Sequence, residues 1–365
     1  MGYLRGKTDK LMFNEGSFQL CRPHKTREAR LIGSILVNFQ ENSRPMINAG
    51  SEHEVSGMAK KIIFIHGRGQ KPDRESLQSL WYDAIEHGLQ RDCKGSDSLQ
   101  AFQNIEKRFV YFGDLSNTLL NKPTEEPLVR QQALIDLKGY TSHQFNKKTY
   151  GEVSKAGFLQ EALADTFSSV LSRLKMAEPL IALVAPDMSH YWYEDSYFGS
   201  DVRYRLMVEL REALDNQDEV MIVAHSLGTM ISYDVLWKLS HYSEYRNAYG
   251  AKKKIDLLVT LGSPLGDESV KERLKGSRLE GMKKYPLNIH RWVNLSAEDD
   301  FISHDSKIKN DFQEMLKLGL IAGGMKDIYP IYNLNVCDGQ SNPHASTGYL
   351  INPQFISVLD EWLTR

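Results

Sequence analysis

Apolar side chains recur every three or four residues in several stretches of the chain. In an α-helix such positions lie on one face, so each stretch predicts a helix that buries that face. The stripes consist of Leu77, Leu80, Trp81, Ile85 and Leu89; of Leu159, Leu163, Phe167, Val170, Leu171 and Leu174; of Leu206, Leu210 and Leu214; and of Phe355, Val358, Leu359 and Trp362.

Short runs of β-branched and other apolar residues lie between these stripes and predict strands. They occupy residues 62–65, 109–112, 220–223, 255–261, 291–295 and 331–336. Continuous apolar runs are typical of strands that are buried on both faces. Because the predicted strands alternate with helices, we expect an α/β fold with a mostly parallel central sheet and helices on both faces.

One domain accounts for most of the chain. Residues 1–57 mix Gly, Asn, Ser and charged residues without a sustained period, which predicts a poorly structured N-terminal extension. The first strong strand follows Met58, so the functional domain is expected to span residues 58–365. Within it, residues 115–151 are polar and irregular with no strand pattern, and loops of this length are often functional. We interpret this segment as a candidate lid or surface insertion.

Composition and charge argue against two classes of partner. The 365 residues are 41% hydrophobic and carry a formal net charge of -2, so no overall field attracts nucleic acid or an anionic membrane surface. The longest apolar runs have the length of strands, well short of the roughly 20 residues that cross a bilayer. We expect no nucleic-acid partner and no stable membrane insertion.

The cysteines and histidines give no sign of a metal or cofactor. Cys21, Cys93 and Cys337 are far apart and lack CxxC spacing, which argues against a disulfide framework or a structural zinc site. No cluster of His and carboxylate residues has convincing metal-ligand spacing. The N-terminus lacks the apolar run of about 7 to 15 residues that a secretory signal needs, so a cytoplasmic location is expected.

The most informative stretch runs from the strand at 220–223 through Ala224, His225, Ser226, Leu227 and Gly228 into a helix. A serine at a sharp strand-to-helix turn stands out above the sheet, and small residues two positions before and after it allow the turn. The helix N-terminus directs N–H groups toward the serine, which favours an anionic intermediate. Such a serine can also merely cap the helix, but the order of strand, turn and helix favours a nucleophile.

This stretch resembles the nucleophile elbow of the α/β-hydrolase superfamily, in particular its lipase-like and esterase-like members. Those members commonly have Gly-His-Ser-x-Gly, and this chain has Ala224 in place of the first glycine. The resemblance covers roughly residues 58–365. It implies an α/β-hydrolase fold and a triad in which Ser226 is the nucleophile. The turn at Gly262-Ser263-Pro264, which follows the strand at 255–261, is also common in lipase-like members.

The resemblance also implies an oxyanion hole. The strand at 62–65 leads into His66-Gly67-Arg68-Gly69, and a His-Gly loop at this place supplies one backbone N–H, here from Gly67 or Arg68. The second donor is the N–H of Leu227, which follows the nucleophile. A dinucleotide fingerprint that starts at Gly67 lacks its third glycine, while a plain tight turn remains an alternative.

The acid and the base of such a triad follow the serine in chain order. After the strand at 291–295 come Glu298, Asp299 and Asp300, and Asp300 precedes the small apolar pair that is typical of a lipase-type acid loop. We favour Asp300, with its two acidic neighbours as alternatives. His344 lies after the last strand and before the closing helix, where the family carries its base.

The resemblance implies a serine hydrolase that cleaves a carboxylic ester or related acyl bond, in a small molecule or a lipid, through an acyl-enzyme and without a cofactor. Two other functions are compatible with the same residues. The triad could transfer the acyl group to an acceptor other than water. The fold could also serve as a non-catalytic binding module.

Overall fold

The computed structural model describes residues 59–154, 186–193, 196–303 and 307–365. Its centre is a six-stranded sheet in which every neighbouring pair is parallel and the order is β2-β1-β3-β4-β5-β6. The strands are Lys60–Ile65 (β1), Glu106–Val110 (β2), Glu219–His225 (β3), Ile255–Leu261 (β4), Ile289–Ala297 (β5) and Met325–Ile331 (β6).

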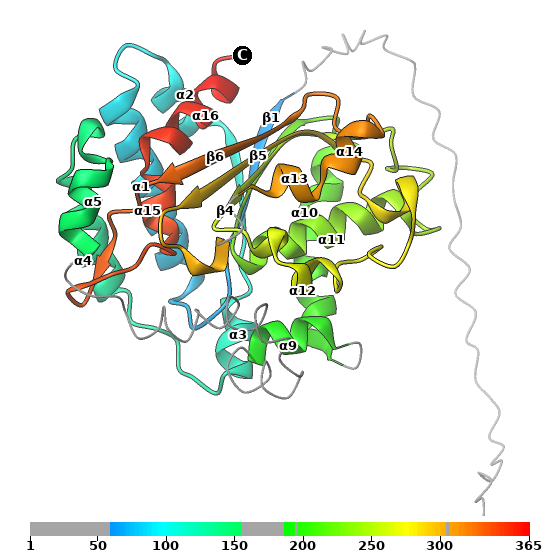
Figure 1. Cartoon of the computed structure of the whole chain (residues 1–365), viewed down its shortest axis with the longest axis horizontal. Helices are drawn as coiled ribbons and strands as arrows, with labels where there is room; N and C mark the ends of the chain where they lie inside the picture. The colour runs from blue at the N-terminus through cyan, green and yellow to red at the C-terminus, as the bar shows by residue number, and fades with distance from the viewer. Residues whose placement is uncertain (1–58, 155–185, 194–195, 304–306) are drawn as a thin grey trace, which may run out of the picture. The chain divides into compact units, whose positions relative to one another are not determined.

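Helices cover both faces of this sheet (Figure 1). Alternate residues of a strand point to opposite faces. Ile63 and Ile65 of β1 therefore pack with Tyr197–Asp215 (α10) and Leu227–His241 (α11), while Ile62 and Phe64 pack with Arg74–Asp92 (α1) and Pro353–Leu363 (α16). The predicted α/β fold with helices on both faces is confirmed.

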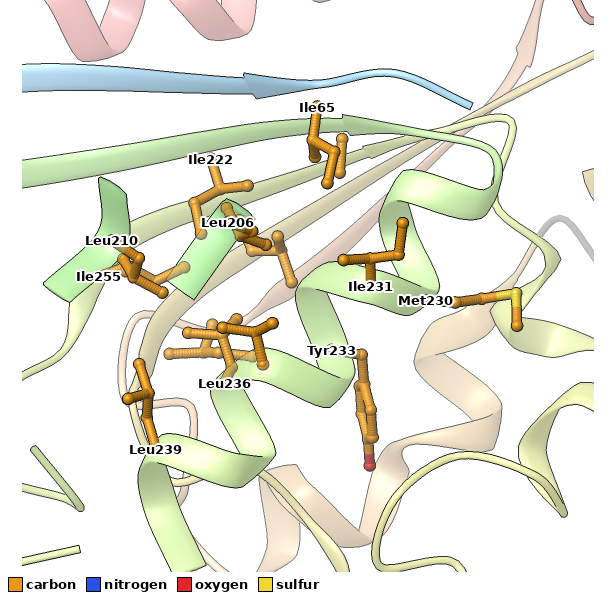
Figure 2. Packing of buried hydrophobic residues seen from close by; sticks show 14 of the residues in the cluster. Ile65, Leu206, Leu210, Ile222, Met230, Ile231, Tyr233, Leu236, Leu239 and Ile255 are labelled. Carbon is orange, nitrogen blue, oxygen red and sulfur yellow. The ribbon is translucent and has the colours of Figure 1, made fainter. Parts of the chain in front are cut away.

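Figure 2 shows the cluster of buried side chains between α10, α11 and the sheet. Leu206 and Leu210 of α10 and Ile231 and Leu236 of α11 meet strand residues such as Ile222. α11 is buried along most of its length, from Leu227 to Ser240. Close packing on several sides fixes the axis of α11 relative to the sheet. The turn between β3 and α11, where Ser226 lies, is therefore held by the core.

Most of the predicted elements correspond to observed ones. The helices predicted from the stripes that begin at Leu77, Leu206 and Phe355 are α1, α10 and α16. The strands predicted at 62–65, 220–223, 255–261 and 291–295 are confirmed as parts of β1, β3, β4 and β5. The predicted extension at 1–57 and the stripe from Leu159 to Leu174 lie outside the described residues.

The strand predicted at 331–336 is wrong in position. The sixth strand of the sheet, β6, ends at Ile331, and residues 332–335 form a loop before Val336–Cys337 (β7), which pairs with Gln340–Ser341 (β8). Two asparagines explain the difference: Asn333 and Asn335 are buried and bond to the segment around His344 rather than to a strand partner.

The segment 115–151 is helical rather than irregular, which corrects the sequence interpretation. It contains most of Gly113–Leu119 (α3), then Leu128–Lys138 (α4) and Ser142–Gln144 (η1), and the start of Lys147–Ser154 (α5). α4 buries Ala133, Leu134 and Leu137, while Leu128, Val129 and Ile135 on its other side are exposed. Leu134 and Leu137 pack into the α1 side of the core. That the segment acts as a lid stays a prediction.

Shorter helices and turns complete the fold. They are Ser98–Asn104 (α2), Pro186–Trp192 (α9), Pro264–Gly266 (η2), Glu268–Lys271 (α12), Gly281–Lys284 (η3), Phe301–Ser303 (η4), Ile308–Asp311 (α13), Gln313–Lys317 (α14) and Ser346–Leu350 (α15). Among the described helices, none combines the length and the apolar character needed to cross a membrane.

Candidate active site

The strand order creates a point where the chain changes direction along the sheet. From β1 the chain proceeds to β2 on one side, and from β3 it proceeds to β4 on the other. The carboxyl ends of β1 and β3 lie side by side, with Ile65 paired with Ala224. In open α/β sheets, ligands bind at the carboxyl ends of the strands at such a point. The two predicted site turns, at Gly67 and Ser226, both begin here.

Ser226 has an unusual backbone conformation. It joins β3 to α11 with φ 54° and ψ -123°, a region that costs a residue with a side chain on the order of 1–3 kcal/mol. Ser226 occupies the N-cap position of α11, yet its side chain makes no capping hydrogen bond. Its Oγ instead lies 2.9 Å from Nε2 of His344. The capping interpretation of Ser226 therefore does not describe this structure.

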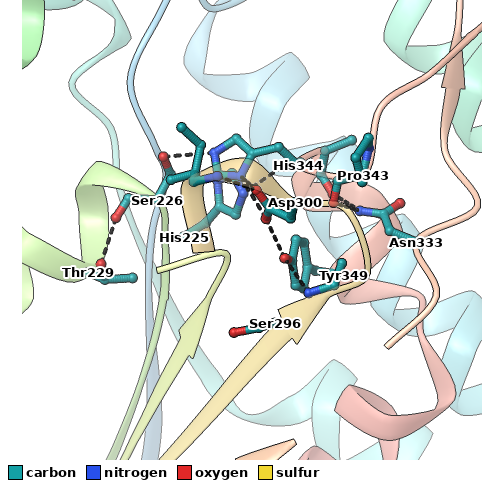
Figure 3. Close-up of polar contacts among 12 residues, drawn as sticks. His225, Ser226, Thr229, Ser296, Asp300, Asn333, Pro343, His344 and Tyr349 are labelled. Atoms are coloured by element: carbon teal, nitrogen blue, oxygen red, sulfur yellow. Dashed lines mark hydrogen bonds and ion pairs between the residues drawn. The ribbon is translucent and has the colours of Figure 1, made fainter. Parts of the chain in front are cut away.

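His344 connects Ser226 to Asp300 (Figure 3). The Nδ1 atom of His344 is 3.0 Å from both carboxylate oxygens of Asp300. A carboxylate at Nδ1 keeps the ring proton there and leaves Nε2 able to accept the serine proton. The structure thus joins the three residues that the sequence suggested as nucleophile, base and acid in one hydrogen-bonded chain.

The three acidic neighbours 298–300 lie in different environments. Asp300 is buried, with 3% of its surface exposed. Asp299 is exposed, has φ 58° and accepts a hydrogen bond from the Tyr150 hydroxyl at 3.2 Å. Glu298 accepts a hydrogen bond from the Tyr329 hydroxyl at 3.0 Å. Of these three residues, Asp300 is the one that contacts His344.

The surroundings of Asp300 favour its charged form. Burial by itself would raise the pKa of this carboxyl group, but the nearby His344 ring and three hydrogen bonds hold the pKa below its usual value. The donors are His344, the Tyr349 hydroxyl and the backbone N–H of Ile302. Asp300 is therefore a carboxylate at neutral pH and can orient His344.

The backbone around His344 is held by buried side chains. Nδ2 of Asn333 donates to the carbonyl oxygens of Pro343 at 2.8 Å and of Ala345 at 2.9 Å. Nε2 of His225 lies 2.8 Å from the carbonyl oxygen of His344. A carbonyl only accepts, so His225 carries a proton on Nε2. Burial and the neighbouring His344 lower the pKa of His225 well below its usual value, so the ring is neutral.

Gly67 lies against Ser226. A Cβ atom added at Gly67 would be 2.6 Å from Cβ and 3.2 Å from Oγ of Ser226, so a larger residue would displace the serine. The Gly67 carbonyl accepts from Nδ1 of His66 at 2.8 Å, because His66 uses Nε2 to accept from the N–H of Phe112. Burial and Lys71 lower the pKa of His66 to about 3. In a trans peptide the following N–H, that of Arg68, points away from the His66 ring.

The turn after Gly67 is attached to α9 through Asp187. Nε of Arg68 donates to Oδ1 of Asp187 at 2.9 Å, and the N–H of Gly69 donates to Oδ2 at 2.7 Å. Burial would raise the pKa of Asp187, but Arg68 and the Gly69 N–H lower it overall. The third predicted oxyanion residue, Leu227, is the first residue of α11, and N–H groups of a first helical turn have no partner within the helix.

The structure reveals site residues that the sequence reasoning missed. Gly262 has φ 54°, and a Cβ atom there would be 2.9 Å from Oδ2 of Asp300 and 3.0 Å from Nδ1 of His344. From the sequence, the turn at 262–264 supports the predicted fold and marks no site residue, although its place after a strand next to β3 is an available signal. Asn333 and Tyr349 contact the triad turns and carry no sequence pattern that marks them.

Ser263 is part of the turn rather than of the triad. Its Oγ donates to the Thr229 hydroxyl at 3.0 Å and accepts from the N–H of Leu265 at 3.2 Å.

Among the described residues, no group of three or more His, Cys, Asp or Glu side chains could hold a metal ion. No family model matches the chain, and neither a curated protein nor a solved structure matches it.

Proposed function

We propose that the protein is a serine hydrolase of the α/β-hydrolase type that cleaves a carboxylic ester or a related acyl bond in a small molecule or lipid. The observation that carries the proposal is the hydrogen-bonded chain Ser226 Oγ, His344, Asp300, with links of 2.9 and 3.0 Å. The three residues occur in the chain order serine, acid, histidine that α/β-hydrolases use.

The chemistry follows from the positions of these atoms. His344 takes the Ser226 proton as Oγ attacks the acyl carbon, and the resulting imidazolium is stabilised by Asp300. The same proton then passes to the leaving group, which leaves an acyl-enzyme on Ser226. Water enters next, gives its proton to His344, attacks the acyl carbon and releases the acid with Ser226 restored.

The proposed oxyanion hole consists of the Leu227 N–H and an N–H from Gly67 or Arg68. The close approach of Gly67 to Ser226 and the orientation of the 67–68 peptide by His66 support this assignment. Donors held before the reaction stabilise the developing negative charge without reorganisation, and loss of one costs roughly 3 to 4 kcal/mol of transition-state stabilisation.

A binding module without catalysis would not need this arrangement. Ser226 keeps a costly backbone conformation and forgoes the capping bond that its position offers. Backbone strain of this kind persists where the surrounding structure imposes it, most often at active sites.

The test is labelling by a fluorophosphonate, which reacts with an activated serine whatever the natural substrate. Wild type is expected to be labelled, Ser226→Ala not at all, and His344→Ala only slowly. Asp300→Asn should lower the reactivity by about 10⁴-fold, because the amide favours the wrong tautomer of the histidine. Asp299→Asn is the matched control and should react as wild type does.

Two results would contradict the proposal. A folded wild-type protein that is not labelled would favour the binding module. An equal loss of labelling in Asp299→Asn and Asp300→Asn would contradict the assignment of Asp300 as the triad acid. If labelling succeeds, an added alcohol distinguishes hydrolysis from acyl transfer, since a transferase forms a new ester with the alcohol.

A further inference from the structure

Tyr349 connects three parts of the candidate site. It lies in α15, which follows His344 after one residue, and its side chain is fully buried. The Tyr349 hydroxyl is 2.5 Å from Oδ2 of Asp300 and 2.9 Å from the backbone nitrogen of Ala297 at the end of β5. Figure 3 shows the tyrosine on the far side of Asp300 from His344 and Ser226.

The direction of these hydrogen bonds is determined by their partners. The N–H of Ala297 can only donate, so the Tyr349 oxygen accepts from it and the hydroxyl proton points to Asp300. A length of 2.5 Å falls in the range of charge-assisted O–H···O⁻ bonds. Burial and the Asp300 charge both raise the pKa of Tyr349 well above its usual value, so the proton stays on the phenol.

The two oxygens of Asp300 are held separately. Oδ1 accepts from the N–H of Ile302 at 3.0 Å, and Oδ2 accepts from Tyr349. Nδ1 of His344 is equally far from both oxygens, at 3.0 Å. Rotation of the carboxylate about its own axis would break one of the outer bonds and make the contact with His344 unequal. The hydroxyl also stabilises part of the carboxylate's negative charge, which without it would be balanced only by His344 and the Ile302 N–H.

We infer that Tyr349 is a positioning residue of the triad: it fixes the plane of the Asp300 carboxylate against His344 and shares its negative charge. The inference rests on the proposed function, and it adds a fourth member to the hydrogen-bonded chain. Without the hydroxyl, the carboxylate would interact more strongly with a protonated His344. The base would then keep its proton to a higher pH, and the serine would be activated less often near neutral pH.

The chain contains a matched hydroxyl for comparison. The Tyr249 hydroxyl donates to Oδ2 of Asp215 at 2.9 Å and accepts from Nε of Arg211 at 3.0 Å, and the Tyr249 ring is buried. It therefore repeats the bonding pattern of Tyr349. Asp215 is the last residue of α10, before β3 begins, so this pair lies toward the end of β3 opposite Ser226.

The experiment compares Tyr349→Phe and Tyr249→Phe by the rate of fluorophosphonate labelling between pH 5 and 10. At the pH where its labelling rate is highest, Tyr349→Phe is expected to react about 10-fold more slowly than wild type. This magnitude is taken from the loss of hydrogen bonds that orient metal-ligating side chains. The acidic limb of its pH–rate profile should move to higher pH. Tyr249→Phe should change neither quantity. A structural role alone would lower the Tm of Tyr349→Phe and leave the acidic limb in place.

Two further measurements separate this inference from the proposed function. In an Asp300→Asn background, Tyr349→Phe should cause no additional loss, because the charge that it orients is gone. In Ser226→Ala, which is inactive, NMR titration of the His344 ring should show a higher pKa when Tyr349→Phe is added. If wild type is labelled at Ser226 and Tyr349→Phe keeps the wild-type rate and limb, the inference is wrong and the function stands.

The inference can also be tested without replacing Tyr349. Its hydroxyl proton in the wild-type protein should resonate far downfield, as expected for a short bond to a carboxylate, and should lose this shift in Asp300→Asn. A wild-type spectrum that lacks such a proton would overturn the assigned bond even if Tyr349→Phe does not fold.

Discussion

Replacing Gly262 by alanine tests whether the His344–Asp300 pair depends on the turn beneath it. The added Cβ would lie 2.9 Å from Oδ2 of Asp300, 3.0 Å from Nδ1 of His344 and 3.1 Å from its Cε1. Ordinary contacts between such atoms are about 3.5 Å or longer. The pair must therefore move by roughly 0.5 Å, or the turn must shift away from it.

Two costs are expected in this variant, and they can be separated. Gly262 has φ 54°, and alanine in the left-handed region costs about 1–2 kcal/mol of unfolding free energy. The displacement of the pair acts on the reaction, where a misplacement of about 1 Å costs on the order of 10²-fold in rate. For a smaller shift we expect fluorophosphonate labelling of Ser226 to slow by about 10-fold to 100-fold.

Gly281 provides the matched control. Its φ is 56°, and a Cβ atom there would meet no described atom within 4 Å. Gly281→Ala should therefore lose a similar unfolding free energy, measured by urea denaturation, and keep the wild-type labelling rate. If Gly281→Ala slowed labelling as much as Gly262→Ala, the effect would come from general destabilisation. If Gly262→Ala reacted as wild type does, the geometric argument would be refuted.

Three further predictions follow from the site. Asn333→Asp puts a carboxylate against the carbonyls of Pro343 and Ala345 and removes the donor that both of them use. Each buried carbonyl without a donor costs about 1–3 kcal/mol, so both the Tm and the labelling rate should fall. An unchanged Tm would refute the stabilising role of these two hydrogen bonds. Because folding lowers the pKa of His66 from about 6.5 to about 3, the unfolded chain binds more protons between these values, and the contribution of His66 to the unfolding free energy should fall by about 2.5 kcal/mol from pH 7 to 4.5. Urea denaturation of His66→Gln should show that much less pH dependence, and an equal dependence would exclude His66 as its source. Ser226→Gly and Ser226→Ala should both be inactive, with the glycine variant more stable by about 1 kcal/mol, since only glycine tolerates φ 54° without strain; calorimetry that ranks alanine higher would argue against the strain.

The sequence predicted the parts of the fold that depend on local signals. Continuous apolar runs mark β1, β3 and β4 because these strands are covered on both faces. β6 lies at the sheet edge, is buried only at every third residue and includes Lys326 and Asp327, so no buried run marks it. The apolar pattern predicts a strand that includes Asn333 and Asn335, because periodicity does not show which partner a buried side-chain amide binds.

The candidate site divides in the same way. Ser226 and Gly67 lie in short motifs whose strand and turn context is visible in the sequence. The choice among residues 298–300 depends on which way each side chain points, and the positive φ of Asp299 turns that residue outward while Asp300 points inward. The contacts of Tyr349 with Asp300 and of Gly262 with His344 join segments 49 and 82 residues apart, as the numbering shows. Such contacts exist only in three dimensions, so no local pattern reveals them.

The late position of His344 in the chain, together with the residues that hold it, has a consequence for how the protein is synthesised. Four parts of the site and core follow β6 in the chain: Asn333, His344, Tyr349 and helix α16. Of these, α16 packs on α1. During synthesis on the ribosome, the turn at Ser226 emerges well before His344, and the apolar face of α1 stays uncovered until α16 is made. Under the proposed function, a partly synthesised chain carries a serine that is not yet activated. The onset of reaction with an acyl substrate during translation would then mark the moment at which the segment around His344 packs against the sheet.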